Sequence, residues 1–388
     1  MLKTCEETKV LRDVIHGYIH IELQVIWDLL NAKEFQRLRR IHQLGGVFQV
    51  YHNADHTRFS HSLGVYEIVR RMVHEIKDIS DRLNEYEKTT VMIAGLLHDI
   101  GHLPFSHGFE RVCDIPHEEF SKRIILGDSE IHDILYKADP GLPQDVADII
   151  SYKHKNGLLN QIVSGQLDAD RMDYLLRDAY FSGTSYGKFD LERILRTIRV
   201  KDGRIVVKES GMHSVEDYIM ARYHMYWQVY YHPIVRSYEI LMEKIFNRMR
   251  DIYPENKEMF DDLKMFVPFL SGEPTIKDHL RLDESAAFYG FTLLCQKEDK
   301  ILKDLCVRVL NRKLLDYKSV KNEEDIEKIK QEVISKGYNP TYYVRVDKAS
   351  KSPYLPYKSN DGHNIYVLDE DGNVNELSCK SVIVKSIV

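Results

Sequence analysis

Apolar residues recur at intervals of three and four along most of this chain, the spacing of helices that bury one face. It predicts helices over residues 24–44, from residue 61 onward, over 169–179 and through most of 235–335. The stripe that follows His61 is the clearest example and consists of Val65, Val69, Met72, Val73 and Ile76. We therefore expect a mostly helical protein.

Short segments rich in alternating or β-branched residues interrupt this helical pattern. Residues 9–22 are expected to be extended around a turn at Gly17, and residues 197–207 to form a hairpin. After residue 339 three β-like runs appear, namely Tyr342–Val346, Ile365–Leu368 and Val382–Val384. The predicted fold class is mostly α, with a β-hairpin insertion and a small C-terminal α+β lobe.

Composition narrows the classes of function. The chain has 388 residues, 43% hydrophobic and 29% charged, as in ordinary globular proteins. A formal net charge of -6 argues against a nucleic-acid partner, so a polyanionic ligand would need a local basic pocket. The N-terminus has no apolar signal segment, the run 91–97 is too short to cross a bilayer, and the five cysteines lack a Cys-x-x-Cys pair. We expect a cytoplasmic protein with reduced thiols and no membrane partner.

The candidate chemistry lies at the end of an apolar helix. Residues 91–97 lead directly into His98-Asp99, and Gly101 then ends the predicted helix. His98 and His102 are four residues apart and would share a helix face. Such donors at the end of a buried helix are suited to holding a metal ion. On its own, a His-Asp pair is more typical of a hydrogen-bonded helix end.

Two further motifs change this interpretation. His56–Gly64 lies upstream of the His-Asp pair, and Asp168–Tyr174 lies downstream. The order His, His-Asp, Asp on a helical chain resembles the HD-domain metal-dependent phosphohydrolases. By position, the resemblance implies four metal ligands, which are His61, His98, Asp99 and Asp170. Mixed nitrogen and oxygen ligands suit iron, manganese, nickel or zinc, and magnesium would accompany nucleotide phosphates.

A closer resemblance is to the deoxynucleoside triphosphate (dNTP) triphosphohydrolases. It rests on Glu34–Ile41, His42–Gly46 and Pro104–His107, and covers about Lys9 to Tyr231. It implies an HD-domain catalytic core with an N-terminal regulatory segment over 1–235. The expected remainder is a helical support and oligomerisation region over 236–335 and the α+β lobe over 336–388.

The resemblance also implies roles for individual residues. The implied catalytic residues are His107, His117, Glu110 and Glu118. The implied substrate-binding residues are Arg58, Gln43, Leu44, His102, Arg171, Tyr174, Asp178, Arg222 and Tyr230. By resemblance, the three arginines and Tyr174 would contact phosphate, whereas Asp178, Tyr230, Gln43 and Leu44 would contact the sugar or the base. Arg171 replaces a lysine of relatives, which preserves charge but alters geometry. The residues implied for a regulatory nucleotide are Lys9, Gln36, Arg39, Asp190, Arg193 and Arg312.

The expected reaction is hydrolysis of a dNTP to a deoxynucleoside and inorganic triphosphate. A nucleotide activator and a homodimer or homotetramer are expected from the resemblance alone. Two alternatives remain open at this point. One is an HD-type phosphodiesterase or nucleotidase that acts on another phosphate ester, and the other is a nucleotide-sensing regulatory protein without turnover.

Overall fold

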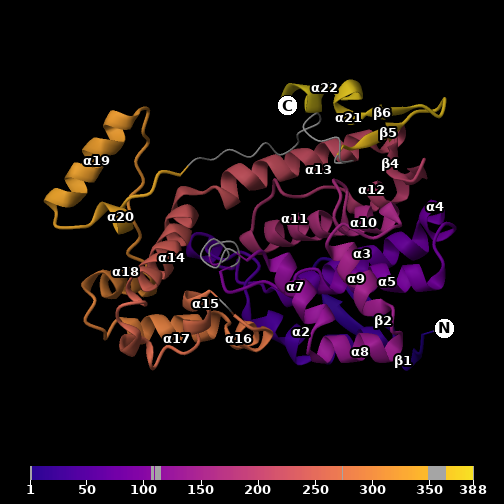
Figure 1. Ribbon diagram of the computed structural model, residues 1–388. Helices are drawn as coiled ribbons and strands as arrows, with labels where there is room; N and C mark the ends of the chain where they lie inside the picture. The colour runs from indigo at the N-terminus through magenta and orange to yellow at the C-terminus, as the bar shows by residue number, and fades with distance from the viewer. Residues whose placement is uncertain (1, 106–108, 110–114, 273, 348–363, 388) are drawn as a thin grey trace.

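The fold is mostly helical with two small sheets, as the sequence predicts (Figure 1). The computed structural model describes residues 2–105, 109, 115–272, 274–347 and 364–387. His107 and Glu110, two of the expected catalytic residues, lie outside these ranges. Among the described helices, none combines the length and the apolar character that crossing a membrane requires.

The chain begins with an antiparallel hairpin of β1 (Thr4–Asp13) and β2 (Gly17–Leu23), which confirms the extended segments expected around Gly17. Gly17 has a φ of 74°, a conformation that glycine adopts without strain. Helices α1 (Gln24–Asn31) and α2 (Lys33–Arg37) follow, and then a 3-10 turn over Leu38–Arg40. The single helix expected over 24–44 is therefore wrong, because the extended backbone of Ala32 (φ -61°, ψ 141°) separates two shorter helices.

The larger apolar core is built on three packed helices. Helix α3 (Arg58–Glu75) packs against both α5 (Glu85–Leu97) and α11 (Ala169–Ser182). The predicted stripe after His61 is buried in this core. The other elements of this part are α4 (Lys77–Ser80), α7 (His117–Leu126), α8 (Glu130–Ala138), α9 (Leu142–Ile150), α10 (Gly157–Val163), α12 (Leu191–Thr197) and a 3-10 turn over Val47–Gln49.

Helix α5 ends at Leu97, earlier than the sequence pattern predicts. His98 and Asp99 lie in the turn that follows, and His98 Nδ1 donates a hydrogen bond of 2.9 Å to the Gly95 carbonyl. That carbonyl belongs to the last turn of the helix, where acceptors lack intrahelical partners. The expectation that His98 and His102 share a helix face is therefore wrong. The turn after α5, and not a helix face, sets the direction of these side chains.

A second apolar cluster, rich in phenylalanine, lies beside the core that contains α3, α5 and α11. It is formed largely by α14 (Pro233–Ile252), α17 (Glu284–Leu294) and α18 (Lys300–Leu310), and Figure 1 shows these helices to one side of the core. Helix α13 (Met212–Met225) and a π-helical turn over Tyr226–Tyr230 precede α14 and contribute buried residues to the larger apolar core. The elements after α14 also include a 3-10 turn over Lys257–Phe260, α15 (Val267–Ser271), α16 (Ile276–Arg281), α19 (Glu323–Ser335) and α20 (Pro340–Tyr343).

The predicted hairpin forms and is extended by strands from the C-terminus. Strands β3 (Ile198–Lys201) and β4 (Arg204–Lys208) are antiparallel, and β5 (Tyr366–Leu368) pairs in parallel with β4. The order of this sheet is β3-β4-β5-β6, and its other elements are β6 (Val374–Glu376), α21 (Leu377–Lys380), α22 (Val382–Ile387) and a 3-10 turn over Glu209–Gly211.

Two of the three β-like runs near the C-terminus do not form strands. Residues 342–346 begin within α20 and continue as irregular chain, while 382–384 open α22. Within residues 382–384 only Val384 is buried, and Val382 is 82% exposed. Short apolar runs do not distinguish a strand from a helix, so packing decided the outcome.

Candidate functional site

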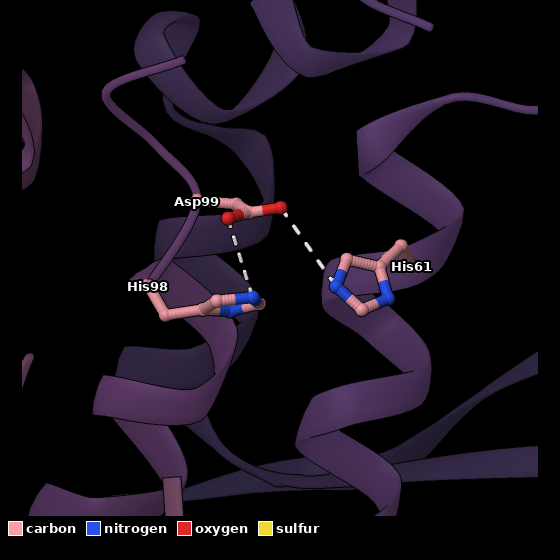
Figure 2. A group of neighbouring side chains, drawn as sticks. All are labelled: His61, His98 and Asp99. Carbon is pink, nitrogen blue, oxygen red and sulfur yellow. Dashed lines mark ion pairs between the residues drawn. The ribbon is translucent and has the colours of Figure 1, made fainter. Parts of the chain in front are cut away.

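Two imidazoles and one carboxylate converge between α3 and the end of α5. His61 lies in the first turn of α3, and His98 and Asp99 lie in the turn after α5 (Figure 2). One ligand atom from each lies within 4.8 Å of the others. Asp99 stands between the rings, with Oδ1 3.4 Å from His98 Nε2 and Oδ2 3.7 Å from His61 Nε2. The fold thus brings together three of the four expected metal ligands.

The fourth expected ligand, Asp170, reaches this cluster from the first turn of α11. Its Oδ1 lies 3.1 Å from His61 Nε2 and 3.6 Å from His98 Nε2. The Asp170 side chain is 32% exposed, whereas that of His61 is fully buried. Asp170 therefore provides the side of the cluster that solvent can reach.

Hydrogen bonds fix the orientation of both imidazoles. Nδ1 of His61 donates to Asp173 Oδ2 at 2.8 Å, and Nδ1 of His98 donates to the Gly95 carbonyl. With a proton on each Nδ1, the neutral ring presents the lone pair of Nε2 to the cluster. Such bonds to the outer nitrogen are typical of histidines that bind metals.

The charges of the cluster favour a cation. Burial lowers the pKa of the His61 imidazole, but Asp170, Asp173 and Asp99 raise it by more, to about 10. Burial raises the pKa of the Asp170 carboxyl, but His61 and His98 hold it well below its usual range. The cluster therefore stabilises positive charge within a largely buried environment.

These residues fit a divalent metal ion. Among the described residues, none forms a hydrogen bond with His98 Nε2, although this atom is buried. A buried polar atom without a partner costs free energy unless a ligand satisfies it. Two imidazole nitrogens and two carboxylates suit iron, manganese, nickel or zinc, and the donor set does not choose among them.

A second histidine group adjoins the first through Asp99. Asp99 Oδ1 lies 3.2 Å from His102 Nε2, and the rings of His102 and His117 stack at 3.7 Å. Burial and the charges of Arg58 and His117 lower the pKa of His102 to about 4, so it is neutral near pH 7. Glu118 Oε2 lies 3.5 Å from His117 Nδ1. The expected His117–Glu118 pair thus forms beside the cluster.

Three arginines expected to contact phosphate occupy different positions. Arg58, the first residue of α3, forms a buried ion pair with Asp99 and belongs to the cluster itself. Arg171 is tied to Asp168, the N-cap of α11. Arg222 on α13 donates to Gln166 Oε1 at 3.0 Å. Of these three arginines, only Arg58 forms an ion pair with an expected metal ligand in the described part of the chain.

Two of the residues expected to contact a sugar, Asp178 and Tyr230, contact each other, and we call this pair the candidate sugar wall. Tyr230 donates from its hydroxyl to Asp178 Oδ2 at 2.7 Å, and the rings of Tyr174 and Tyr230 meet edge to face at 6.4 Å. Gln43 is buried and lies on the chain beside the half-buried Leu44. The backbone N–H of Gln43 donates to the His56 carbonyl at 2.9 Å, which joins this segment to the start of the His61 motif.

The residues expected at a regulatory site are divided among several elements. Gln36 and Arg39 bond to each other at 2.9 Å, and Lys9 lies on β1. Asp190 caps α12, and Arg193 donates to the Ser210 carbonyl at 2.8 Å. Arg312, beyond α18, donates to the Gln49 carbonyl. In Figure 1 α18 and α12 lie at opposite ends of the view, so one chain does not gather these residues into one site.

Sequence reasoning missed three residues behind the expected site. Asp173 contacts both His61 and His16, and His56 Nε2 donates to Asp178 Oδ1 at 2.8 Å. The spacing of three residues between Asp170 and Asp173 could have placed Asp173 next to the metal ligands on α11. His16 carries no comparable signal, because its contact joins residues 157 positions apart.

Comparisons with known proteins agree with this geometry. The HD domain family model matches residues 58–178, and the HD associated region model matches residues 189–289. The chain is 46% identical to the uncharacterized protein YwfO of Bacillus subtilis, over 98% of this chain and 89% of that protein. The structure resembles a phosphohydrolase of Bacteroides thetaiotaomicron with a TM-score of 0.85 and 27% identity, covering 97% of this chain and 95% of that one.

A more distant relative is the Dictyostelium discoideum homologue of the deoxynucleoside triphosphate triphosphohydrolase SAMHD1. It is 30% identical over 68% of this chain and 53% of its own length. The full-length similarity to YwfO, the two family models and the arrangement around His61 and His98 all point to the same family. The chain belongs to the HD-domain phosphohydrolases that carry an HD-associated region.

Proposed function

We propose that this protein hydrolyses dNTPs to deoxynucleosides and inorganic triphosphate. The proposal rests on one observation: helix α11 carries residues of both the candidate metal cluster and the candidate sugar wall. Asp170, Tyr174 and Asp178 recur every four residues and share one face of this helix. With a rise of about 1.5 Å per residue, Asp178 lies about 12 Å along the helix from Asp170. This face offers separate places for the phosphates and the sugar of one nucleotide.

The proposed reaction breaks the bond between the α-phosphorus and the 5'-oxygen. A water oxygen forms the new bond to phosphorus, and the 5'-oxygen leaves with a proton. His61, His98, Asp99 and Asp170 would hold a divalent metal ion, which supplies Lewis-acid activation of the α-phosphate when bound. Asp99 and Asp170 are acceptors only and would repel phosphate, so cationic side chains must offset their charge.

The remaining residues of the site are proposed to bind and orient the substrate. Arg58 is the closest described arginine to the cluster and would shift from Asp99 toward a phosphoryl oxygen. His107 would deliver a proton to the leaving oxygen, and His117, held near Glu118, would contact the phosphates. His102, which is neutral near pH 7, would orient a phosphate or the attacking water through its ring nitrogens.

The sugar wall supports a preference for deoxyribose. The Tyr230 hydroxyl donates a hydrogen bond to Asp178, so the tyrosine side chain lies next to that carboxylate. In the proposed pose Asp178 accepts from the 3'-hydroxyl, while a ribose 2'-hydroxyl would meet the ring of Tyr230. A wall of this kind discriminates by leaving an additional hydroxyl crowded or without a partner.

Product analysis tests the proposal directly. Purified protein is incubated with each dNTP and each ribonucleotide, alone and in mixtures, with manganese, iron, nickel, zinc or magnesium. Chromatography should detect a deoxynucleoside and intact triphosphate in equal amounts. Asp170→Ala should lose both metal binding and triphosphate release, whereas Glu327→Gln, on the exposed face of α19, should keep both.

Other products would replace this proposal with a different one. Release of orthophosphate or pyrophosphate would identify a nucleotidase or another phosphohydrolase within the same family. Tight nucleotide binding without turnover under every metal condition would identify a nucleotide sensor. An Asp170→Ala variant that loses the metal but keeps the full rate would contradict the mechanism.

Regulation and assembly form a second part of the proposal. The expected regulatory residues are distributed over separate elements of one chain, so an activator site would need to combine residues of two or more copies. We propose a homodimer or homotetramer whose assembly depends on a nucleotide. Light scattering after size exclusion, with and without each nucleotide, should record a change in mass that accompanies activation.

A further inference from the structure

Asp173, next to the candidate metal cluster, is held by an unusual number of donors. Its Oδ2 accepts from His61 Nδ1 at 2.8 Å and from Arg177 Nε at 2.9 Å. Its Oδ1 accepts from His16 Nε2 at 2.7 Å and from Arg177 Nη2 at 2.9 Å. Each oxygen thus has two donors, and the position of the carboxylate is fixed from four directions.

One of these donors comes from the N-terminal hairpin. His16 lies in the turn between β1 and β2, and its side chain is 3% exposed. Asp13, at the end of β1, accepts from the backbone N–H groups of Ile15 and His16 at 2.8 and 3.0 Å. The same carboxylate accepts from Arg177 Nη1 at 2.8 Å. The turn therefore holds Asp173 twice, directly through His16 and indirectly through Asp13 and Arg177.

The core leaves space for this network and excludes water from it. Asp173 and Arg177 are fully buried. Gly64, one turn after His61 on α3, has no side chain at the point where the network approaches the helix. A Cβ at Gly64 would lie 1.8 Å from Asp173 Oδ1 and 2.4 Å from Arg177 Nη2. Buried charges without partners are costly, so each contact that completes this network constrains the others.

We infer that the turn of the N-terminal hairpin is part of the metal site, and that His16 is a positioning residue that aligns His61 through Asp173. The inference rests on the proposed metal site but not on the identity of the substrate. His61 offers Nε2 to the cluster only while Nδ1 donates to Asp173. Loss of the His16 donor leaves Asp173 Oδ1 with Arg177 alone and lets the carboxylate turn away from His61. Metal affinity should therefore depend on a residue that does not touch the metal.

The test measures binding of Co²⁺ alone, because its visible absorption reports both affinity and ligand geometry. His16→Phe keeps a ring and removes the donor, while His16→Gln keeps an N–H donor at a similar reach. His20→Phe is the matched control, since it makes the same change at an exposed position of the same hairpin. Thermal melting with chelator present shows whether each variant is folded.

His16→Phe should weaken Co²⁺ binding about tenfold and change the absorption spectrum, in line with the effect of altering outer contacts of metal ligands. His16→Gln should restore binding to near the wild-type value, and His20→Phe should match the wild type. If His16→Phe does not fold, His16→Asn, which is too short to reach Asp173, should show the same loss.

Two results would overturn the inference, and they have different meanings. A folded His16→Phe or His16→Asn variant with wild-type affinity and spectrum would show that His16 only packs against the core. Failure of the wild-type protein to bind Co²⁺ would remove the metal site and the inference with it. Because the measurement uses no nucleotide, a wrong substrate assignment leaves its outcome unchanged.

Discussion

The Tyr230 hydroxyl donates a hydrogen bond of 2.7 Å to Asp178, which links the π-helical turn after α13 to the far end of α11. The other oxygen of Asp178 accepts from His56 Nε2 at 2.8 Å. Both oxygens of this carboxylate are therefore oriented by ring side chains. The proposed discrimination between sugars requires rigid positioning of this kind.

Tyr230→Ala should weaken the preference for dNTPs. Removal of the ring opens space beside Asp178, so the ratio of kcat/KM for a dNTP to that for the matching ribonucleotide should fall at least about tenfold. Tyr230→Phe keeps the ring and should retain most of the ratio. Tyr180→Ala, at a position on α11 that is 54% exposed, is the control. An unchanged ratio in Tyr230→Ala would remove the sugar wall from the proposal.

Metal binding should stabilise the folded protein. An ion that binds only the folded state at about 100 times its Kd adds about 2.7 kcal/mol to the free energy of unfolding. The melting temperature should therefore rise as Mn²⁺ is titrated and return to its starting value when a chelator is added. Asp170→Ala should show almost no shift. If no divalent ion changes the melting temperature of the wild-type protein, the cluster is not a metal site.

Gly64→Ala should be destabilising although it adds one methyl group. The new Cβ would overlap with Asp173 and Arg177, which are buried and cannot move without breaking their bonds. Overpacking of this kind costs about 1–3 kcal/mol. Denaturant unfolding measures the loss, and Co²⁺ binding should weaken with it. Gly157→Ala is the matched control, because nothing lies within 4 Å of its added Cβ. Equal stability of the two variants would contradict the packing described here.

The His42–Glu284 pair should make stability depend on pH. Burial lowers the pKa of His42, but Glu284 raises it by more, above the usual 6.5. Because the pKa of His42 is raised in the folded state, the pair stabilises the folded protein fully below about pH 6.5. This stabilisation is lost as the pH rises through the folded-state pKa of His42. The pair joins the HD core to α17, since Glu284 also accepts from the His42 backbone N–H at 3.0 Å.

The measurement compares the melting temperatures of wild type and His42→Gln across this pH range. The difference should be largest at pH 6 and shrink as the pH rises. His20→Gln, at an exposed position, should give no such trend. A difference between wild type and His42→Gln that grows with pH would reverse the sign and contradict the assignment of a charged His42.

Much of the candidate site could be predicted because its residues form local motifs. His98-Asp99 follows an apolar run, and the motifs that contain His61 and Asp170 lie on helices with clear periodicity. The expected sugar residues Asp178 and Tyr230 also meet in the structure. The helix limits were less accurate, since α5 ends at Leu97 and the region after Gln24 forms two helices. Capping bonds and single extended residues determine such limits, and apolar spacing does not record them.

The sequence by itself determined the helical class, because periodicity is a property of neighbouring positions. Its short motifs resembled a known family, and that resemblance implied the four residues that converge on one point. Tertiary structure decided what surrounds them. It placed the hairpin turn with His16 against Asp173, paired β5 with β4, and set His102 against His117. These contacts join distant segments through packing and buried charge, and the free energy that selects them depends on the whole core.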